Sequence, residues 1–369
     1  MKNASECHRP VLYYKSVKGR HGLLAKEQVF SIDGVTPPHH YHPLSLHSTR
    51  TMKSRPRVQL TEEHARALKM PTIGAQSQDV TKIAFPDGTA NYVMLARPNS
   101  TCKHLRSLHK HIMSEEKGNI LHSFLMRQGK NSLVKDNLGG GRYFASGYGN
   151  MGRNVSPTVR PPTQPALRKS FKYAAHHELA KIVGRMYVYI SKCIAEHCSD
   201  IYRANKEIAA KNPNLAWPPL EYQDVQWSWM SSQFIIRQRH PDSLTEEWPL
   251  EKDMVATHTD TGDLDCIMFH CYITGGGDRN KGGHVPGTDI AIFENRNGGA
   301  GYRVETCIED TVVLVVYNSR RQLHGCIKPS NYVYGEGCAW SIRIIPYIPK
   351  GVHDWMLRNP NGTPYAKIP

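Results

Sequence analysis

The sequence lacks the features that define several protein classes. None of its 369 residues lies in a run of 18 apolar side chains, so no transmembrane helix is predicted. The first twenty residues contain no apolar segment of the kind that a secretory signal requires. Its nine cysteines form no C-x-x-C pair and no zinc-type array, which favours reduced thiols. We therefore expect a nuclear or cytoplasmic protein that is not secreted and does not contact a membrane.

Acidic residues are scarce relative to basic ones. Against 47 Lys and Arg there are only 32 Asp and Glu, which gives a formal net charge of +15. An excess of this size favours a polyanionic partner, with nucleic acid first. Because the basic residues are spread along the chain, a generally basic soluble protein remains the alternative.

The N-terminal part divides into two predicted regions. Residues 1–60 are rich in His, Lys, Arg and Pro and have little apolar periodicity, as in an extended basic arm that can follow a phosphate backbone. Residues 61–160 should hold short helices at 61–70 and 100–128 and a β-hairpin at 83–96. Residues 138–162 combine glycines, aromatics and arginines, which suits either a mobile loop over a substrate or an interdomain linker.

Residues 161–369 have the pattern of a catalytic domain with its supporting helix. A helical apolar period runs through residues 170–211 and ends at Asn212-Pro213. From about Val225 onward, five to seven strand-like runs are separated by Gly, Asn and Asp turns, with no helical pattern between them. This order predicts an α+β protein with a jelly-roll core, buttressed by helices and preceded by a basic N-terminal extension.

His258 and Asp260 form the central motif of the predicted core. Two side chains separated by one residue point the same way on extended backbone. An imidazole and a carboxylate on one face supply two of the three ligands of the 2-His-1-carboxylate triad that binds non-heme Fe(II). The continuous apolar run 311–317 leads through a turn to His324, the candidate third ligand.

Arg343 is a basic residue inside the otherwise apolar strand SIRIIPYI. A buried Arg requires an anionic partner, and a carboxylate held in a bidentate fork is the natural one. Ser341 lies two residues earlier and should face the same side of the strand. If each residue is read singly, His258 and Asp260 could be a structural pair, His324 a core histidine and Arg343 the partner of a buried acid.

The order His-x-Asp, strands, His, strand, Arg resembles the Fe(II)/2-oxoglutarate dioxygenase superfamily, whose core is a double-stranded β-helix. The extended HTDTGD motif, the long upstream helix, the Gly282-Gly283 turn and the basic charge look most like the TET/JBP branch. The resemblance implies that His258, Asp260 and His324 bind iron, and that Arg343 with Ser341 holds the distal carboxylate of 2-oxoglutarate. The SNYVYGEG insertion before Arg343 departs from the family pattern and leaves another co-substrate, such as ascorbate, open.

The resemblance also implies a function. An enzyme of this branch uses Fe(II), 2-oxoglutarate and O2 to oxidise the methyl group of 5-methylcytosine or thymine in DNA, on a base flipped out of the stack. Two alternatives remain: a hydroxylase of a protein side chain or small metabolite, and a non-catalytic jelly-roll module that binds nucleic acid. The substrate-contact candidates, chosen from composition and position, are Arg142, Tyr143, Arg153 and Arg237.

Overall fold

The computed structural model describes the backbone of residues 11–14, 29–32, 60–85, 89–113, 142–149, 158–160, 173–211, 229–238, 257–266, 268–275, 289–296, 298–328 and 340–359. Within these residues the chain forms two β-sheets and five helices, which confirms the predicted α+β class. No helix in this part of the chain is both long and apolar enough to cross a membrane.

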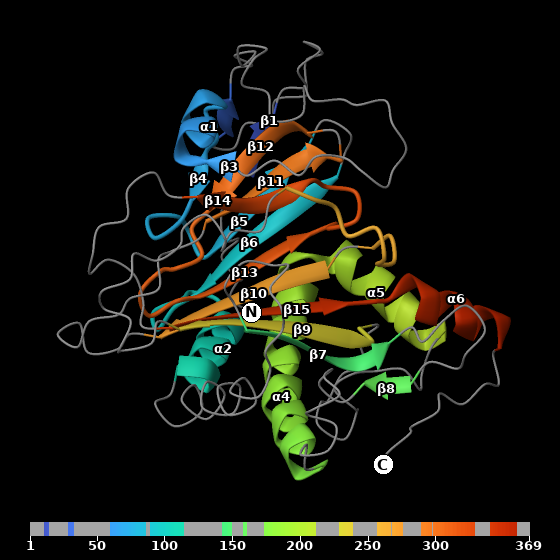
Figure 1. The fold of residues 1–369 in the computed structure, drawn as a ribbon. Coiled ribbons are helices and arrows are strands. Elements are labelled where there is room, and N and C mark those ends of the chain that lie inside the picture. The colour runs from blue at the N-terminus through green and yellow to red at the C-terminus, as the bar shows by residue number, and fades with distance from the viewer. Residues whose placement is uncertain are drawn as a thin grey trace, which may run out of the picture.

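The larger sheet has ten strands and spans the molecule (Figure 1). Its central ladders, from β5 to β9, are antiparallel, and β1 pairs in parallel with both β2 and β5. In spatial order its strands are β2 (Val29–Ile32), β1 (Val11–Tyr14), β5 (Val80–Ala84), β6 (Ala90–Ala96), β13 (Val312–Tyr317), β10 (Met268–Gly275), β15 (Trp340–Tyr347), β9 (Ser231–Gln238), β7 (Arg142–Gly149) and β8 (Thr158–Arg160).

The smaller sheet has five strands and faces the larger one. Its antiparallel centre is extended on each side by a two-residue strand that pairs in parallel. In spatial order its strands are β3 (Leu60–Thr61), β14 (His324–Lys328), β11 (Ile290–Asn295), β12 (Gly298–Val304) and β4 (Thr72–Ile73).

From β9 onward the chain alternates between the two sheets. It runs from β9 in the larger sheet to a bridge at His258 beside β14, returns to β10, and crosses to β11 and β12. It then enters β13, crosses to β14 and ends in β15. This alternation gives the strand order of an eight-stranded jelly roll, as the sequence predicted.

Side chains of the central strands point alternately into two cores, because both faces of the larger sheet are buried. On β13, Val312, Leu314 and Val316 pack against helices, whereas the intervening residues pack against the smaller sheet. A strand buried on both faces is expected to be a continuous apolar run, which is what residues 312–317 show. The jelly-roll interior therefore lies between the sheets, and a second core lies under the helices.

Helices cover the outer face of each sheet (Figure 1). Side chains from four helices share the core beneath the larger sheet: α2 (Lys103–Met113), α4 (Tyr173–His197), α5 (Ser199–Lys211) and α6 (Lys350–Arg358). The predicted helix at 170–211 is thus two helices that meet at Cys198. Against the smaller sheet packs α1 (Glu62–Ala67), whose N-cap Thr61 accepts a hydrogen bond from the amide of His64.

Residues 138–162 do not form only a loop or linker, because they contain β7 and β8. β7 pairs along its length with β9, and this pairing continues the larger sheet beyond the jelly roll. Because of its glycines, the aromatic strand β7 was not predicted, and its backbone partner β9 lies in the C-terminal half of the chain. The predicted arm likewise contributes β1 and β2, and its other residues up to 59 lie outside the described part. The three predicted regions therefore share one sheet.

Candidate metal centre

The structure brings His258, Asp260 and His324 together at the edge of the jelly roll. Asp260 lies between the two imidazoles: its Oδ1 is 3.5 Å from His258 Nε2 and its Oδ2 is 3.5 Å from His324 Nε2. The potential ligand atoms of the three side chains all lie within 4.8 Å of one another. Two imidazoles and one carboxylate are the donor set of the non-heme Fe(II) triad.

Backbone pairing holds the two histidines opposite each other. His258 and His324 exchange two hydrogen bonds, with N to O distances of 2.9 and 3.0 Å, and so form an antiparallel bridge. The amide of Asp260 donates to the carbonyl of Ser319 at 2.9 Å. The extended backbone before the loop thus orients one imidazole, and the loop itself orients the carboxylate.

Side chains join the 258–266 loop to the turn that precedes His324. Asp265 accepts hydrogen bonds from Asn318 Nδ2 at 2.9 Å and from Arg321 Nε at 2.7 Å. The hydrogen bond from Arg321 lowers the pKa of Asp265 below its usual value. Arg320 donates to the carbonyl of Asp263. Since these contacts span more than fifty residues of sequence, they fix the distance between the Asp260 carboxylate and His324.

His324 is prepared to act as a ligand. Its Nδ1 lies 3.1 Å from the carbonyl of Gln322, which fixes Nδ1 as the donor and leaves the lone pair of Nε2 directed at Asp260. Burial, followed by the neighbouring His258, lowers the pKa of His324 to about 4. The imidazole is therefore neutral at physiological pH, as metal binding requires.

Among the described residues, Asp260 is the carboxylate that faces both imidazoles, although Asp263 follows three residues later. Burial and, to a lesser extent, the charge of Asp260 raise the pKa of Asp263 to about 8. Asp263 is thus largely protonated at neutral pH. This arrangement matches a triad with a single carboxylate and fits a divalent cation held by His258, Asp260 and His324.

Solvent can reach the ligands from one side. The side chains of His258 and Asp260 are 24% and 30% exposed, whereas that of His324 is 4% exposed. A cation at this point would be bound by the three side chains on its protein side, and a second molecule could bind it from the solvent side. An open position is what separates a catalytic site from a closed structural one.

Arg343 projects from β15 into the space between the sheets. Its guanidinium carbon lies 4.7 Å from the centre of the Tyr272 ring, and its Nη2 lies 3.4 Å from Cys326 Sγ. Tyr272 stands opposite Arg343 in the β10–β15 ladder. Within the described residues, no Asp or Glu forms an ion pair with Arg343. The expectation of an anionic partner is therefore not met by the protein itself in this part of the chain. Ser341 shares the strand face of Arg343 and stands opposite Thr274.

A buried histidine and tyrosine connect the triad to the interior. The Tyr317 hydroxyl lies 3.1 Å from Nδ1 of His270, and both rings stand edge-on to His324, at centroid distances of 5.2 and 6.0 Å. Burial lowers the pKa of His270 well below its usual value and keeps it neutral. His270 packs against the ligand His324 and is not one of the three donors that meet at the triad. Sequence patterns did not single out Tyr317 on β13 or Tyr272 on β10 as part of the site. Both side chains lie on the inner face of strands next to the ligands.

The predicted substrate contacts are spread over two strands. Tyr143 on β7 and Arg343 on β15 both stand opposite Ile235 of β9, so the three form one row across the sheet. Arg142 stands opposite Ile236, and Arg237 opposite Ser341. Their backbones thus lie on the half of the sheet that carries Arg343, and their role stays a prediction. Arg153 and the Gly282-Gly283 turn lie outside the described residues.

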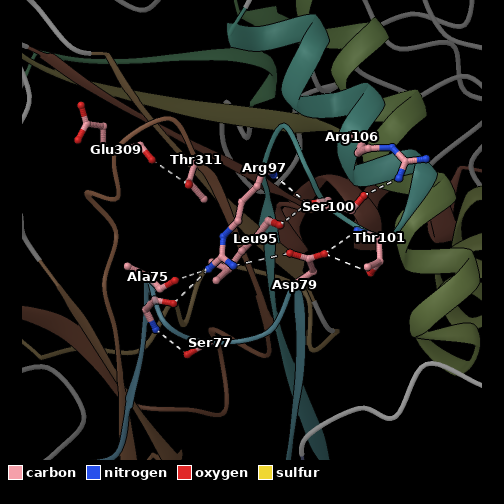
Figure 2. Close-up of polar contacts among 11 residues, drawn as sticks. Ala75, Ser77, Asp79, Leu95, Arg97, Ser100, Thr101, Arg106, Glu309 and Thr311 are labelled. Atoms are coloured by element: carbon pink, nitrogen blue, oxygen red, sulfur yellow. Dashed lines mark hydrogen bonds and ion pairs between the residues drawn. The ribbon is translucent and has the colours of Figure 1, made fainter.

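A surface hollow of about 570 Å³ lies elsewhere and is lined by residues of three loops, among them Arg97, Glu305 and Thr311. Thr311 precedes β13 whereas Asn318 follows it, so roughly 20 Å of strand separates the hollow from the triad. Figure 2 shows that Arg97 reaches the carbonyl of Ala75 and the carboxylate of Asp79. Because these contacts join the loops to one another, we assign the hollow no part in the metal chemistry.

Several solved structures resemble this chain at low identity. OsALKBH1 is 10% identical, with a TM-score of 0.32 over 69% of this chain and 97% of its own. A protein from Caulobacter crescentus assigned to the 2OG-Fe(II) oxygenase family is 11% identical, with a TM-score of 0.29 over 69% of this chain and 77% of its own. A full-length Neurospora crassa protein, solved in complex with alpha-KG, is 12% identical, with a TM-score of 0.31 over 70% of this chain and 92% of its own.

No protein-family model matches the sequence, and no curated protein matches it. Likenesses at this distance do not place the chain in a family. The case for a function therefore rests on the residues of the site.

Proposed function

We propose that this protein is an Fe(II)-dependent dioxygenase that uses 2-oxoglutarate and oxidises the methyl group of 5-methylcytosine, or thymine, in DNA. The observation that carries the proposal is the triad of His258, Asp260 and His324, held on paired backbone beside a part-buried Arg343. The jelly-roll strand order supports it, because it places the triad at one edge of the barrel and Arg343 inside.

His258, Asp260 and His324 would hold Fe(II) through two imidazole nitrogens and one carboxylate. When bound with 2-oxoglutarate and O2, the iron supplies the oxidising chemistry. The protein's part is positional: Gln322 fixes the tautomer of His324, and the Ser319 carbonyl fixes the backbone of Asp260. Tyr317 and His270 pack behind His324 and keep water from that side of the site.

Arg343 would hold the distal carboxylate of 2-oxoglutarate, with the Ser341 hydroxyl beside it. A part-buried guanidinium with no acidic partner among the described residues is electrostatically incomplete, and a bidentate carboxylate would satisfy it. Tyr272 stacks on the guanidinium and would keep its plane fixed for that contact. Ascorbate carries no such carboxylate, so the geometry favours 2-oxoglutarate.

DNA is the proposed substrate because the chain is strongly basic and the site is open to solvent. The net charge of +15 favours a polyanionic partner, and the side chains of His258 and Asp260 are part exposed. Contacts from basic side chains to phosphates hold a duplex without reading its sequence. A base must leave the stack to bring its methyl group to the metal. The HTDTGD motif, similar to the TET/JBP branch, supports 5-methylcytosine or thymine as that base.

The test follows both products of the reaction. Iron-loaded protein is incubated anaerobically with 2-oxoglutarate, and oxygen and DNA containing 5-methylcytosine are then admitted. Base composition is read by mass spectrometry together with succinate. We expect an oxidised base and succinate in parallel, both absent in Asp260→Ala.

Other outcomes separate the alternatives. An oxidised base without succinate would retain the iron site and reject 2-oxoglutarate, and ascorbate would be tried next. Succinate formed without base oxidation would point to a protein side chain or small metabolite as substrate. DNA binding that survives Asp260→Ala, with no co-substrate consumed by the wild type, would indicate a non-catalytic module.

A further inference from the structure

A second group of metal-binding side chains lies beneath the larger sheet, where the start of α2 meets the end of α4. Cys102 precedes the first residue of α2, and Glu196 and His197 are the last two residues of α4. Their potential ligand atoms all lie within 4.8 Å of one another. Figure 1 shows α2 and α4 side by side against the sheet. The group belongs to the helical layer and shares no residue with the triad.

Cys193 lies beside this group. It is one helical turn before His197 on α4, so Cys193, Glu196 and His197 share one helix face at positions i, i+3 and i+4. The Cys193 thiol hydrogen-bonds to Cys102 across the two helices. Neither sulfur is in a disulfide. The group of Cys102, Glu196 and His197 thus has a second sulfur next to it, in contact with Cys102.

We propose that Cys102, Cys193, His197 and Glu196 bind a structural zinc ion that joins the start of α2 to the end of α4. Thiolates select zinc over the hard cations that prefer oxygen ligands. No local sequence spacing indicates this group, because Cys102 and Cys193 are ninety-one residues apart.

The distances are close to those of a tetrahedral zinc site. With Zn–S near 2.3 Å and Zn–O near 2.0 Å, a tetrahedral angle places sulfur and oxygen about 3.5 Å apart. Cys102 Sγ lies 3.5 Å from Glu196 Oε2. The corresponding nitrogen–oxygen edge is about 3.3 Å, whereas His197 Nε2 lies 3.9 Å from the other carboxylate oxygen, Oε1. A rotation of the Glu196 carboxylate would therefore have to accompany binding of the ion.

Both helix ends favour the charges that such a site needs. The positive end of α2 lies at Cys102 and favours a thiolate there. The negative end of α4 lies at His197 and favours a cation there.

Burial suits a structural ion. The Cys102 and His197 residues are each 7% exposed and Cys193 is 0% exposed, whereas the Glu196 side chain is 48% exposed. The ion would be enclosed by the first three ligands and reached from solvent past Glu196. A closed set of four protein ligands is typical of structural zinc, in contrast to the open triad.

The test is made in a background without the triad, so that zinc cannot bind there. The full-length Asp260→Ala/His324→Ala protein is loaded with zinc, freed of excess metal and analysed by mass spectrometry of the elements. We expect one zinc per chain, lost on adding Cys102→Ser and retained on adding the control Cys307→Ser, a half-buried cysteine of another region. Circular dichroism establishes that each variant is folded.

Glu196→Ala provides a variant whose folding is not at risk, because the side chain is half exposed. Loss of a group that supports a metal typically weakens its binding roughly 10- to 100-fold, and loss of a direct ligand should weaken it by at least as much. Titration against a chromophoric chelator measures the zinc affinity. Cobalt substitution adds an independent readout: thiolate-to-cobalt charge-transfer absorption is expected, and Cys102→Ser should reduce it.

Three results would overturn the proposal. One is the absence of retained zinc in the background protein. Another is zinc retention that neither Cys102→Ser nor Glu196→Ala changes. The third is a Cys102–Cys193 disulfide in the unreduced native protein, found by peptide mapping, because oxidised sulfurs cannot ligate the ion.

Discussion

The two faces of the larger sheet are built from the same strands and differ in chemistry. On the helix side, β10 presents Phe269, Cys271 and Ile273 to a mainly apolar core. On the other side, the intervening positions carry His270 and Tyr272, and neighbouring strands add Tyr317 and Arg343. A period of two residues thus separates the side chains that stabilise the fold from those that surround the metal centre.

The difference has a physical basis. The helix side is closed by four helices, so a polar group there loses its water and needs a partner within the protein, as Tyr187 has in Ser232. The inner side ends at the triad, where the Tyr317 hydroxyl contacts His270 and the Tyr272 ring covers the Arg343 guanidinium. Substitutions on the helix face should therefore change stability, and those on the inner face should change metal or co-substrate binding.

The largest effect is expected for Asp260→Ala, at the open end of the inner face. Removal of one of three ligands should lower iron affinity by at least roughly 100-fold and reduce turnover to background. The unfolding free energy of the metal-free protein should change by less than about 0.5 kcal/mol, because the carboxylate is part exposed. Iron content and denaturant unfolding measure the two quantities.

Asp354→Ala is the matched control for that variant. Asp354 pairs with Lys350 on the surface of α6, and such a pair contributes about 0.3–0.5 kcal/mol. It should retain its iron. Equal iron loss in both variants would contradict the assignment of Asp260 as a ligand.

Arg343→Met should weaken 2-oxoglutarate binding by about 2–5 kcal/mol, or roughly 30-fold and more, because it removes one partner of a desolvated charge pair. Without co-substrate the variant should be as stable as the wild type or more stable, since an unpaired, part-buried charge is removed. Anaerobic calorimetry and denaturant unfolding measure these changes. Arg358→Met on α6 is the control, and a stability loss of about 3–5 kcal/mol in Arg343→Met would instead indicate a buried protein partner.

Leu314→Ala tests the helix face of β13. Leu314 is fully buried, so its truncation should cost about 3 kcal/mol of unfolding free energy. The folded fraction should bind iron with wild-type affinity, as measured by titration under stabilising conditions. A lower iron affinity with unchanged unfolding free energy would contradict the assignment of stability to the helix face and of metal binding to the inner face.

Tyr317→Phe should have the smallest effect. It tests whether Tyr317 only packs in the core or also supports the metal ligand His324. Loss of its hydrogen bond to His270 should cost about 0.5–1.5 kcal/mol. The control is Tyr302→Phe, whose hydroxyl accepts a hydrogen bond from Asn91 in the same inter-sheet core. Both should lose similar stability in urea unfolding, whereas only Tyr317→Phe should alter iron affinity. Identical iron affinities would assign Tyr317 to packing alone.

Local patterns were enough to predict much of the core. The alternation of residues 231–238 and the apolar run at 312–317 indicated strands, because side-chain direction follows backbone geometry. The same rule placed His258 with Asp260, and Ser341 with Arg343, on common faces. The turn before His324 made it the third ligand candidate, and the structure brings it within 3.5 Å of Asp260.

Pairing between distant segments could not be predicted in this way. Nothing near β7 specifies that it pairs with β9, and the glycines around it suggested a loop. Nor does the sequence around Arg343 show that Tyr272 stacks on it or that no acid among the described residues pairs with it. The joining of α2 and α4 at Cys102 and Cys193 also depends on how the helices pack.

By itself, the sequence determined most strands of the jelly-roll core, which of their faces are apolar, and which side chains have the chemistry of metal ligands. These properties follow from side-chain direction and donor type, which are local. Tertiary structure alone decided that the ligands meet, that Arg343 has Tyr272 as its neighbour, and that a second donor group forms beneath the sheet. Such contacts depend on strand order and helix packing, where the free energy comes from residues far apart in the chain.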